Sequence, residues 1–302
     1  MFPIIPANSV AAVSGNTEGI FGFGYIAGNT DTTNLVSNTG VVASDVTGVG
    51  TARHAPAATQ YGGDKGIFGY GTVSGNVSVT NLVSNAGVVA SDQAATTGTA
   101  RGFGAACSYG TDKGIFGYGA LTFSMTNLVS NAGVVSTDVT GVGTGRYRLA
   151  ACEYGTDTAI FAYGTSGGTT YFSLSNKVSN VGVVASDVTG VGTARHGVGA
   201  CSYGYDKGIF GYGYVTNITS PLSVSNLVSN TGVIASDQAA TTGTARGKVA
   251  ACEYGQDKAI FGFGNDGSNI GETNLVSNAG VVASDVTAVG TAREALAACS
   301  FN

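Results

Sequence analysis

One arginine and one aspartate recur at regular intervals along the chain, and they form its clearest pattern of ionisable residues. The arginines are Arg53, Arg101, Arg146, Arg195, Arg246 and Arg293, and the aspartates are Asp45, Asp92, Asp138, Asp187, Asp237 and Asp285. The six guanidinium groups could form an anion-binding ring. Alternatively, each planar guanidinium could bond carboxylates or carbonyls between neighbouring units. Because every copy carries the pair unchanged, we favour the structural role.

Residues typical of catalysis are few. His54 and His196 occupy equivalent positions in two different copies, which would place them on opposite sides of a ring and exclude one small shared site. The HExxH motif of zinc peptidases and the phosphate-binding P-loop are absent from the sequence. We therefore predict that the protein is not an enzyme and needs no cofactor. An enzyme with a site on the ring axis is the less favoured alternative.

The cysteines also recur once per copy. Cys107, Cys152, Cys201, Cys252 and Cys299 each follow small residues in AAC or GAC, and Thr59 takes this place in an earlier copy. An odd number of cysteines, one per copy, is not typical of a disulfide framework. We predict that they are small buried hydrophobic residues and that the chain has no metal site.

All these residues belong to a repeat whose most constant stretch is DKGIFGYG. Variants of it occur at Glu18–Gly24, Asp64–Gly71, Asp112–Gly119, Asp157–Gly164, Asp206–Gly213 and Asp257–Gly264. Their leading isoleucines, from Ile20 to Ile260, are 45 to 51 residues apart. A period in this range indicates a solenoid, a propeller or another array of repeated units.

The repeated IFGYG stretch reads as a β-strand whose side chains alternate between two faces. Ile115, Gly117 and Gly119 are expected on one face, and Phe116 and Tyr118 on the other. Glycine weakens an isolated strand, so its recurrence requires a reason such as the close approach of a neighbouring sheet. We predict that the ring of one copy lies over the glycines of the next. A set of flexible glycine-rich loops is the weaker alternative.

Each copy contains four strand-like pieces separated by turn signals. In order they read AACEYG, IFGYG, TNLVSNAGVVASD and GVGTAR, and we call them pieces A to D. No stretch shows the 3.6-residue period of a helix. Four strands per copy and six copies predict an all-β fold, a six-bladed β-propeller of four-stranded blades. We expect the propeller to span residues 15–302 and to follow an N-terminal arm of residues 1–14.

The order of the pieces resembles the kelch repeat. Arg101–Gly119 has the arginine lead-in, the small-residue strand and the glycine-containing strand in kelch order, but an aromatic residue displaces the second glycine of the pair and the outer-strand tryptophan is absent. The resemblance implies a ring closed by a C-terminal strand in the first blade. We therefore predict that Leu296–Ser300 pairs with Ile20–Phe23. In the competing arrangement, Val10–Ser14 completes that blade.

The strings IFGYG, TNLVSN and GVVASD also resemble repeats in predicted structural proteins of marine tailed bacteriophages. This resemblance implies a virion component, assembled in the host cytoplasm, with other virion proteins or copies of itself as partners. The N-terminus lacks the basic and apolar regions of a signal peptide, which agrees with that location. The sequence has no apolar run of the roughly 20 residues that span a bilayer. Its net charge of −5 does not indicate a basic surface that would bind nucleic acid. We expect neither membrane insertion nor a nucleic-acid partner.

The copies differ most in the connections between pieces B and C and between pieces D and A, which strand alternation places at one end of the ring. Variable loops on a rigid scaffold are where recognition usually occurs, although neutral drift would look the same. Candidate binding residues on this variable face are Tyr25, Phe103, Phe123, Tyr147, Tyr171, Phe172, His196, Tyr214 and Asn217. We predict a structural or receptor-binding virion component that recognises a host-surface glycan or protein. The alternative is a kelch-like protein- or glycan-binding propeller outside a virus.

Overall fold

The computed structural model describes residues 16–94, 98–167, 169–216, 218–238 and 243–302. Within these residues the chain forms strands and turns and no helix, so the predicted all-β class is confirmed. The expected N-terminal arm, residues 1–14, and the competing strand Val10–Ser14 lie outside the described residues.

The described residues form six antiparallel sheets of three strands each. The first contains β1 (Glu18–Tyr25), β2 (Asn29–Val36) and the last strand, β20 (Ala297–Phe301). The second contains β3 (Ala57–Tyr61), β4 (Lys65–Gly69) and β5 (Thr80–Val83), and the third β6 (Ala105–Tyr109), β7 (Lys113–Gly119) and β8 (Phe123–Val129). The fourth contains β9 (Ala150–Tyr154), β10 (Thr158–Ala162) and β13 (Ser175–Val178). The fifth contains β14 (Gly199–Tyr203), β15 (Lys207–Gly211) and β16 (Ser225–Val228), and the sixth β17 (Ala250–Tyr254), β18 (Lys258–Asn265) and β19 (Asn269–Val276). A short hairpin pairs β11 (Thr165–Gly167) with β12 (Thr170–Tyr171).

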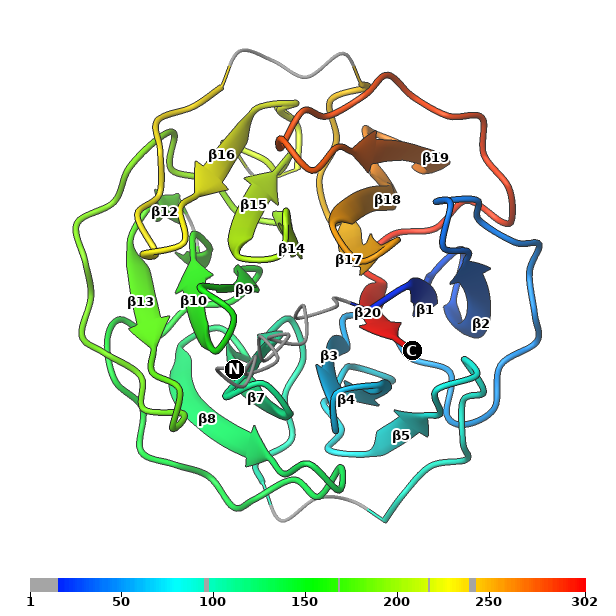
Figure 1. The fold of residues 1–302 in the computed structure, drawn as a ribbon, viewed down its shortest axis with the longest axis horizontal. Helices are drawn as coiled ribbons and strands as arrows, with labels where there is room; N and C mark the ends of the chain where they lie inside the picture. Colours follow the sequence, from blue (N-terminus) through cyan, green and yellow to red (C-terminus); the bar gives the residue numbers. More distant parts are fainter. Residues whose placement is uncertain (1–15, 95–97, 168, 217, 239–242) are drawn as a thin grey trace, which may run out of the picture.

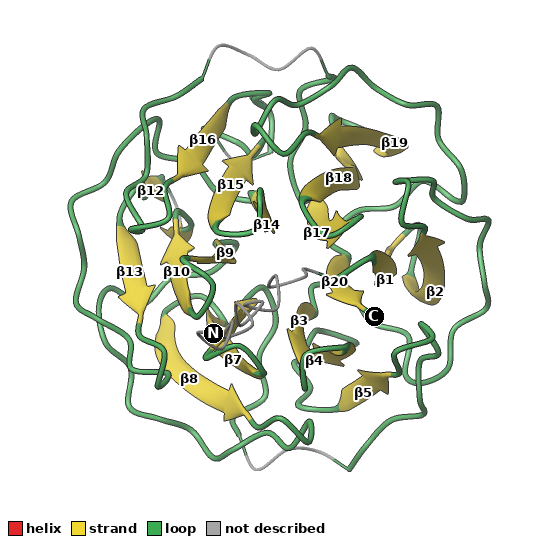
Figure 2. Ribbon diagram, viewed as in Figure 1, coloured by secondary structure: helices red, strands yellow, loops and turns green. Residues whose placement is uncertain are grey.

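The sheets lie around a common centre, as Figures 1 and 2 show. Their innermost strands are β3, β6, β9, β14, β17 and β20. Each of these strands contacts the next, and β20 contacts β3. Every sheet therefore contributes one strand to the lining of the centre.

The predicted fourth strand of each sheet does not form within the described residues. The segments after β2 and β5 make only isolated bridges, such as Thr33 with Val46 and Thr80 with Gln93. A physical reason is visible at Thr51, whose backbone N–H is donated to the Asp92 carboxylate of the next sheet and not to a neighbouring strand. The expectation of four-stranded blades is therefore wrong in this respect, because piece D connects neighbouring sheets.

The C-terminal strand completes the first sheet, as predicted. β20 runs antiparallel to β1, with Ile20 opposite Cys299 and Gly22 opposite Ala297. The backbone N–H of Thr17 also donates to the Asn302 carbonyl at 2.8 Å. Among the described residues, the last strand thus lies beside the first.

Glycines of the IFGYG stretch lie under phenyl rings of a neighbouring sheet. A Cβ atom placed on Gly117 would lie 2.8 Å from Cζ of Phe161, and one placed on Gly22 would lie 2.8 Å from Cζ of Phe68. The predicted close approach is confirmed, although the ring comes from the following copy and not from the preceding one.

The predicted alternation of the aromatic side chains is wrong beyond Gly117. Phe116 packs against Tyr70 of the preceding sheet with ring centroids 5.2 Å apart, whereas Tyr118 packs against Phe161 of the following sheet at 5.1 Å. Tyr118 has a φ of 63°, and the strand register shifts between Gly117 and Gly119. This β-bulge redirects the second ring. Each copy consequently sends one aromatic ring to each of its neighbours.

Replacing Gly117 by valine is expected to destabilise the fold by about 1–3 kcal/mol, because the new side chain would overlap the Phe161 ring. Gly75→Val is the matched control, since a Cβ at Gly75 meets no atom within 4 Å. Chemical unfolding of the two variants checks this. Equal free energies of unfolding for Gly117→Val and wild type would contradict the packing of ring over glycine.

Candidate functional site

The recurrent arginines lie between neighbouring sheets, as the structural interpretation predicts. Arg195 is fully buried, and its Nε donates to the Tyr212 carbonyl at 2.8 Å while its Nη2 donates to Oδ1 of Asn226 at 2.7 Å. Its Cζ lies 4.1 Å from the ring centroid of Tyr163 in the preceding sheet. The same asparagine bond and ring contact occur in all six copies. Buried in this way, the arginines hold sheets together and do not present an anion-binding ring.

The recurrent aspartates belong to the same contacts. Asp237 lies 3.8 Å from Nη1 of Arg195 and accepts hydrogen bonds from Thr193 and from Nδ2 of Asn226. Burial acts to raise the pKa of the Asp237 carboxyl, but the hydrogen bonds and Arg195 outweigh burial and lower it below its ordinary value. The carboxylate is therefore ionised at neutral pH and joins Thr193 of one copy to Asn226 of the next.

The two sets of variable connections meet at one end of the ring, as predicted. Isolated bridges join five of the six B–C loops to a D–A segment, including Tyr25 with Glu294 and Tyr147 with Thr165. The A–B turns lie at the other end of the innermost strands. In β3, for example, the D–A segment precedes Ala57 and the A–B turn follows Tyr61.

Four aromatic side chains form a continuous arc on this variable face. Edge-to-face contacts link Tyr25 to His54 at 5.6 Å, His54 to Phe103 at 5.6 Å, and Phe103 to Tyr147 at 6.2 Å between ring centroids. Tyr25 is exposed, and the other three rings are partly exposed. The structure therefore brings together three of the residues predicted from the sequence and adds His54.

The other predicted residues divide between burial and the rim. His196 and Tyr214 are buried, with exposed fractions of 1% and 0%, and Tyr171 stacks on His196 at 5.2 Å. Burial, followed by the charge of Arg148, lowers the pKa of His196 to about 4, so this ring is neutral at pH 7. His196 and Tyr214 therefore lie beneath the variable face and are not exposed on it. Phe123 and Phe172 are partly exposed, and Asn217 lies outside the described residues.

A closed circle of backbone hydrogen bonds surrounds the axis at the variable face. Each residue donates its N–H to the carbonyl of the equivalent residue one sheet before, at 2.7 to 3.2 Å, in the order Ala55, Ala295, Lys248, Gly197, Arg148, Phe103 and back to Ala55. All six residues have φ between 50° and 67°. The left-handed backbone is uncommon outside glycine, and here it points every N–H along the circle.

Arg148 projects from this circle toward the aromatic arc. Its Cζ lies 5.2 Å from the ring centroid of Phe103 and 5.5 Å from that of Tyr147. Its Nε is buried and finds no acceptor among the described residues. The neighbouring cation, Lys248, is paired with Glu294 at 2.7 Å. Arg148 and Lys248 both line a shallow cavity of about 70 Å³ at the mouth of the axis.

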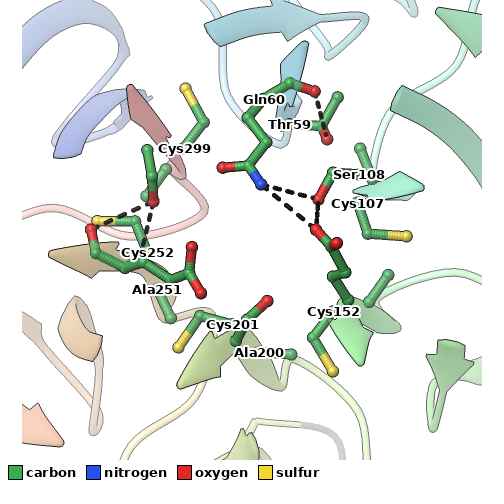
Figure 3. A pocket seen from close by; sticks show the side chains of 17 residues that line it. Thr59, Gln60, Cys107, Ser108, Cys152, Ala200, Cys201, Ala251, Cys252 and Cys299 are labelled. Carbon is green, nitrogen blue, oxygen red and sulfur yellow. Dashed lines mark hydrogen bonds between the residues drawn. The ribbon is translucent and has the colours of Figure 1, made fainter. Parts of the chain in front are cut away.

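Polar side chains line the axis deeper in the ring, one from each innermost strand. They are Gln60, Ser108, Glu153, Ser202, Glu253 and Ser300, and they border a narrow cavity of about 50 Å³. In Figure 3 the Gln60 amide extends toward Ser108, whereas the thiols of Cys107, Cys152 and Cys299 point away from the centre. All five cysteines are buried and unpaired, as predicted.

The two glutamates on the axis hold their protons unusually tightly. Burial raises the pKa of Glu153 to about 7, although hydrogen bonds from Ser108 and Gln60 act in the opposite direction. Burial, followed by the negative charge of Glu153, raises the pKa of Glu253 to about 8. The axis therefore carries two coupled carboxyl groups that titrate near neutral pH.

Glu253→Gln is expected to raise the melting temperature by several degrees in alkaline, chelator-treated buffer and to change it little in acid. The folded protein binds the Glu253 proton more tightly than the unfolded chain, so the carboxyl increasingly destabilises the fold as the pH rises from 4.5 to about 8. Thermal melts across this range test the prediction. Glu272→Gln, on the outer strand of the same sheet, is the control. Parallel pH profiles for wild type and Glu253→Gln would contradict it.

Sequence reasoning did not single out Glu153 and Glu253. Both stand in the string AACEYG, at a position that holds serine in three other copies and glutamine in one. A carboxylate at two of six otherwise equivalent positions, next to a buried cysteine, is the signal that could identify them.

No protein-family model matches this sequence, and no curated protein is significantly similar to it. In the part of the chain that the structure describes, no three or more His, Cys, Asp or Glu side chains are grouped to hold a metal ion. Nor do these residues include a helix long and apolar enough to cross a membrane.

Proposed function

We propose that residues 15–302 constitute a closed six-bladed β-propeller that acts as a non-enzymatic binding component. The proposal of a closed ring is supported by the circle of hydrogen bonds from Ala55 to Ala295, which returns to its starting residue. It is also supported by the pairing of β20 with β1 and by the contact of β20 with β3. In such a ring each innermost strand is the inner edge of its sheet, and these short edges are protected around the axis.

The observation that carries the binding role is the aromatic arc on the variable face. Tyr25 ends β1, whereas Phe103 and Tyr147 precede β6 and β9, yet their rings form one surface with His54. Aromatic rings supply large, rigid contact areas at low entropic cost and are favoured at recognition surfaces. Arg148 beside the arc adds a cation that can orient a polar or anionic group of the partner.

We further propose that the protein is a structural or receptor-binding component of a bacteriophage virion, assembled in the host cytoplasm. This rests on the resemblance of the IFGYG, TNLVSN and GVVASD strings to phage structural proteins. Its partners are then other virion proteins or copies of itself, with a glycan or protein of the host surface bound at the variable face. Neither nucleic acid nor insertion into a membrane is involved. The alternative is a protein- or glycan-binding propeller outside a virus.

The genes that flank this one test the virion proposal. Capsid and tail genes on both sides support it, and their absence favours the alternative. Labelling of purified particles with an antibody against this protein would then locate it in the assembly.

The variable face is tested by alanine substitution at Phe103 and Tyr147, each of which should weaken binding to an array of bacterial surface glycans at least tenfold. The fold should be unaffected, because both rings are partly exposed. Tyr205→Ala, which removes an exposed ring at the A–B end, is the control. Equal effects of all three substitutions would contradict recognition by this face.

A further inference from the structure

The six polar side chains on the axis fall into two groups, one with hydrogen-bond partners among the described residues and one without. On one side, Gln60 Nε2 donates to Ser108 Oγ at 3.0 Å and to Glu153 Oε2 at 3.4 Å, and Ser108 also bonds Glu153. Ser300 is occupied as well, because its hydroxyl bonds the backbone N–H of Glu253 at 2.8 Å. The remaining two positions, Ser202 and the Glu253 side chain, follow Glu153 around the ring.

The Glu253 carboxylate is buried without a partner. Its residue is 8% exposed, and burial and the charge of Glu153, with no hydrogen bond, determine the shift of its pKa. It lines both the axial cavity and a second cavity of about 90 Å³ that opens among the A–B turns. Glu153 and Ser202 line the same two cavities. Two carboxylates and one hydroxyl therefore line the same two cavities.

The nearby cations do not compensate these carboxylates. The lysines of the A–B turns pair with the aspartates that precede them, as in Lys113 with Asp112 at 2.6 Å and Lys207 with Asp206 at 2.9 Å. The recurrent arginines are held between the sheets. Buried carboxylates ordinarily bind a proton, pair with a cation or coordinate a metal ion.

Glu153, Ser202 and Glu253 offer oxygen atoms at this place, beside the Gln60 and Asn16 amides that also line the cavity. The neighbouring cysteines are directed elsewhere: a Cβ placed on Gly208 of the adjacent sheet would lie 2.4 Å from Sγ of Cys152. Oxygen ligands suit hard divalent cations, and Ca²⁺ accepts irregular geometry and several waters in its coordination sphere. A cavity of about 90 Å³ has room for an ion with some of its waters.

We propose that Glu253, Ser202 and Glu153 form a binding site for a hydrated calcium ion on the axis, at the A–B end. Two carboxylates are few for a calcium site, and water completes the coordination. The expected dissociation constant is accordingly on the order of 0.1–1 mM, as in weak extracellular calcium modules. The ion neutralises the buried charge where innermost strands converge, so it stabilises the folded ring.

Terbium luminescence provides a direct measurement on the full-length protein. The chain has no tryptophan, and Tyr154 and Tyr205 line the cavity, so tyrosine excitation should sensitise a Tb³⁺ ion bound there. In alkaline buffer, calcium should displace the signal in the concentration range given above, and magnesium should do so less well because it requires stricter geometry. Calcium should also raise the melting temperature.

Variants separate this site from non-specific binding. Glu253→Gln keeps the shape and removes the charge, and Glu253→Ser introduces the residue found at three of the equivalent positions. Both should weaken calcium binding at least tenfold and abolish the calcium-dependent rise in melting temperature, while Glu272→Gln binds as wild type does. Glu253→Ser serves if Glu253→Gln does not fold.

Two results would overturn the proposal. One is no displacement of terbium and no thermal shift in wild type at about 10 mM calcium, roughly ten times the weakest expected dissociation constant. The other is calcium binding that persists unchanged in both Glu253 variants. Neither result bears on the binding role proposed for the variable face, because that face lies at the opposite end of the innermost strands.

Discussion

Removal of residues 294–302 is expected to abolish cooperative folding. The deletion takes away β20, which supplies the third strand of the first sheet and contacts both β17 and β3. It also exposes buried side chains of β1, including Ile20 and Phe21, whose neighbours in the core include Cys299 and Leu296. Circular dichroism and thermal melting of the truncated chain measure the effect.

The control is a chain that lacks residues 1–9. It should melt like the full-length protein, because β20 and not the N-terminal segment completes the first sheet. A C-terminal truncation that melts at the temperature of the full chain would refute the role given to β20.

Arg195→Ala is expected to destabilise the fold by about 3–5 kcal/mol, the range seen when one partner of a buried charged network is removed. The substitution leaves the Tyr212 carbonyl and Oδ1 of Asn226 without their donor and Asp237 without its cation. It also opens a cavity beside the Tyr163 ring. Urea unfolding of the variant gives the free energy directly.

Lys207→Ala provides the comparison for Arg195→Ala. Lys207 pairs with Asp206 on an exposed turn, where an ion pair contributes at most about 1 kcal/mol. If the two alanine variants unfold with similar free energies, the buried arginine does not join the sheets in the way described.

The repeated strand and its neighbour contacts could be predicted because they depend on local pattern. The sequence of IFGYG suggests alternation, which holds as far as Gly117, and glycine opposite an aromatic ring has few explanations other than close packing, which Gly117 and Phe161 bear out. The arginine role followed similarly from a pair present in every copy. Pairing of the C-terminal strand with β1 could be anticipated because the resemblance to the kelch repeat implies a C-terminal strand in the first blade.

Other features depend on geometry that the sequence does not display. The reversed direction of Tyr118 arises from a φ of 63° at a register shift, and a simple alternation of side chains cannot anticipate it. Piece D could not be recognised as a connection because Thr51 bonds a carboxylate 41 residues away. The site on the axis needs the innermost strands to converge before Glu153 and Glu253 face one space. On the variable face, sequence variation identified the rim residues but did not distinguish exposed Tyr25 from buried Tyr214.

The hydrogen bond between Thr17 and Asn302 shows that the two ends of the described chain lie side by side in one sheet. Arg293 joins the sixth sheet to the first through the same asparagine bond and ring contact as its equivalents. Within the first sheet, strand pairing alone holds β20 against β1, where a turn joins the corresponding strands of the other sheets. The place where the polypeptide starts is therefore arbitrary with respect to the architecture. A circularly permuted gene, in which translation begins at a different copy, would encode the same fold with its termini in another sheet. In the closed ring proposed above, new sequence can be fused at any of six positions around the rim, so the point of attachment can be chosen independently of the surface that the protein presents.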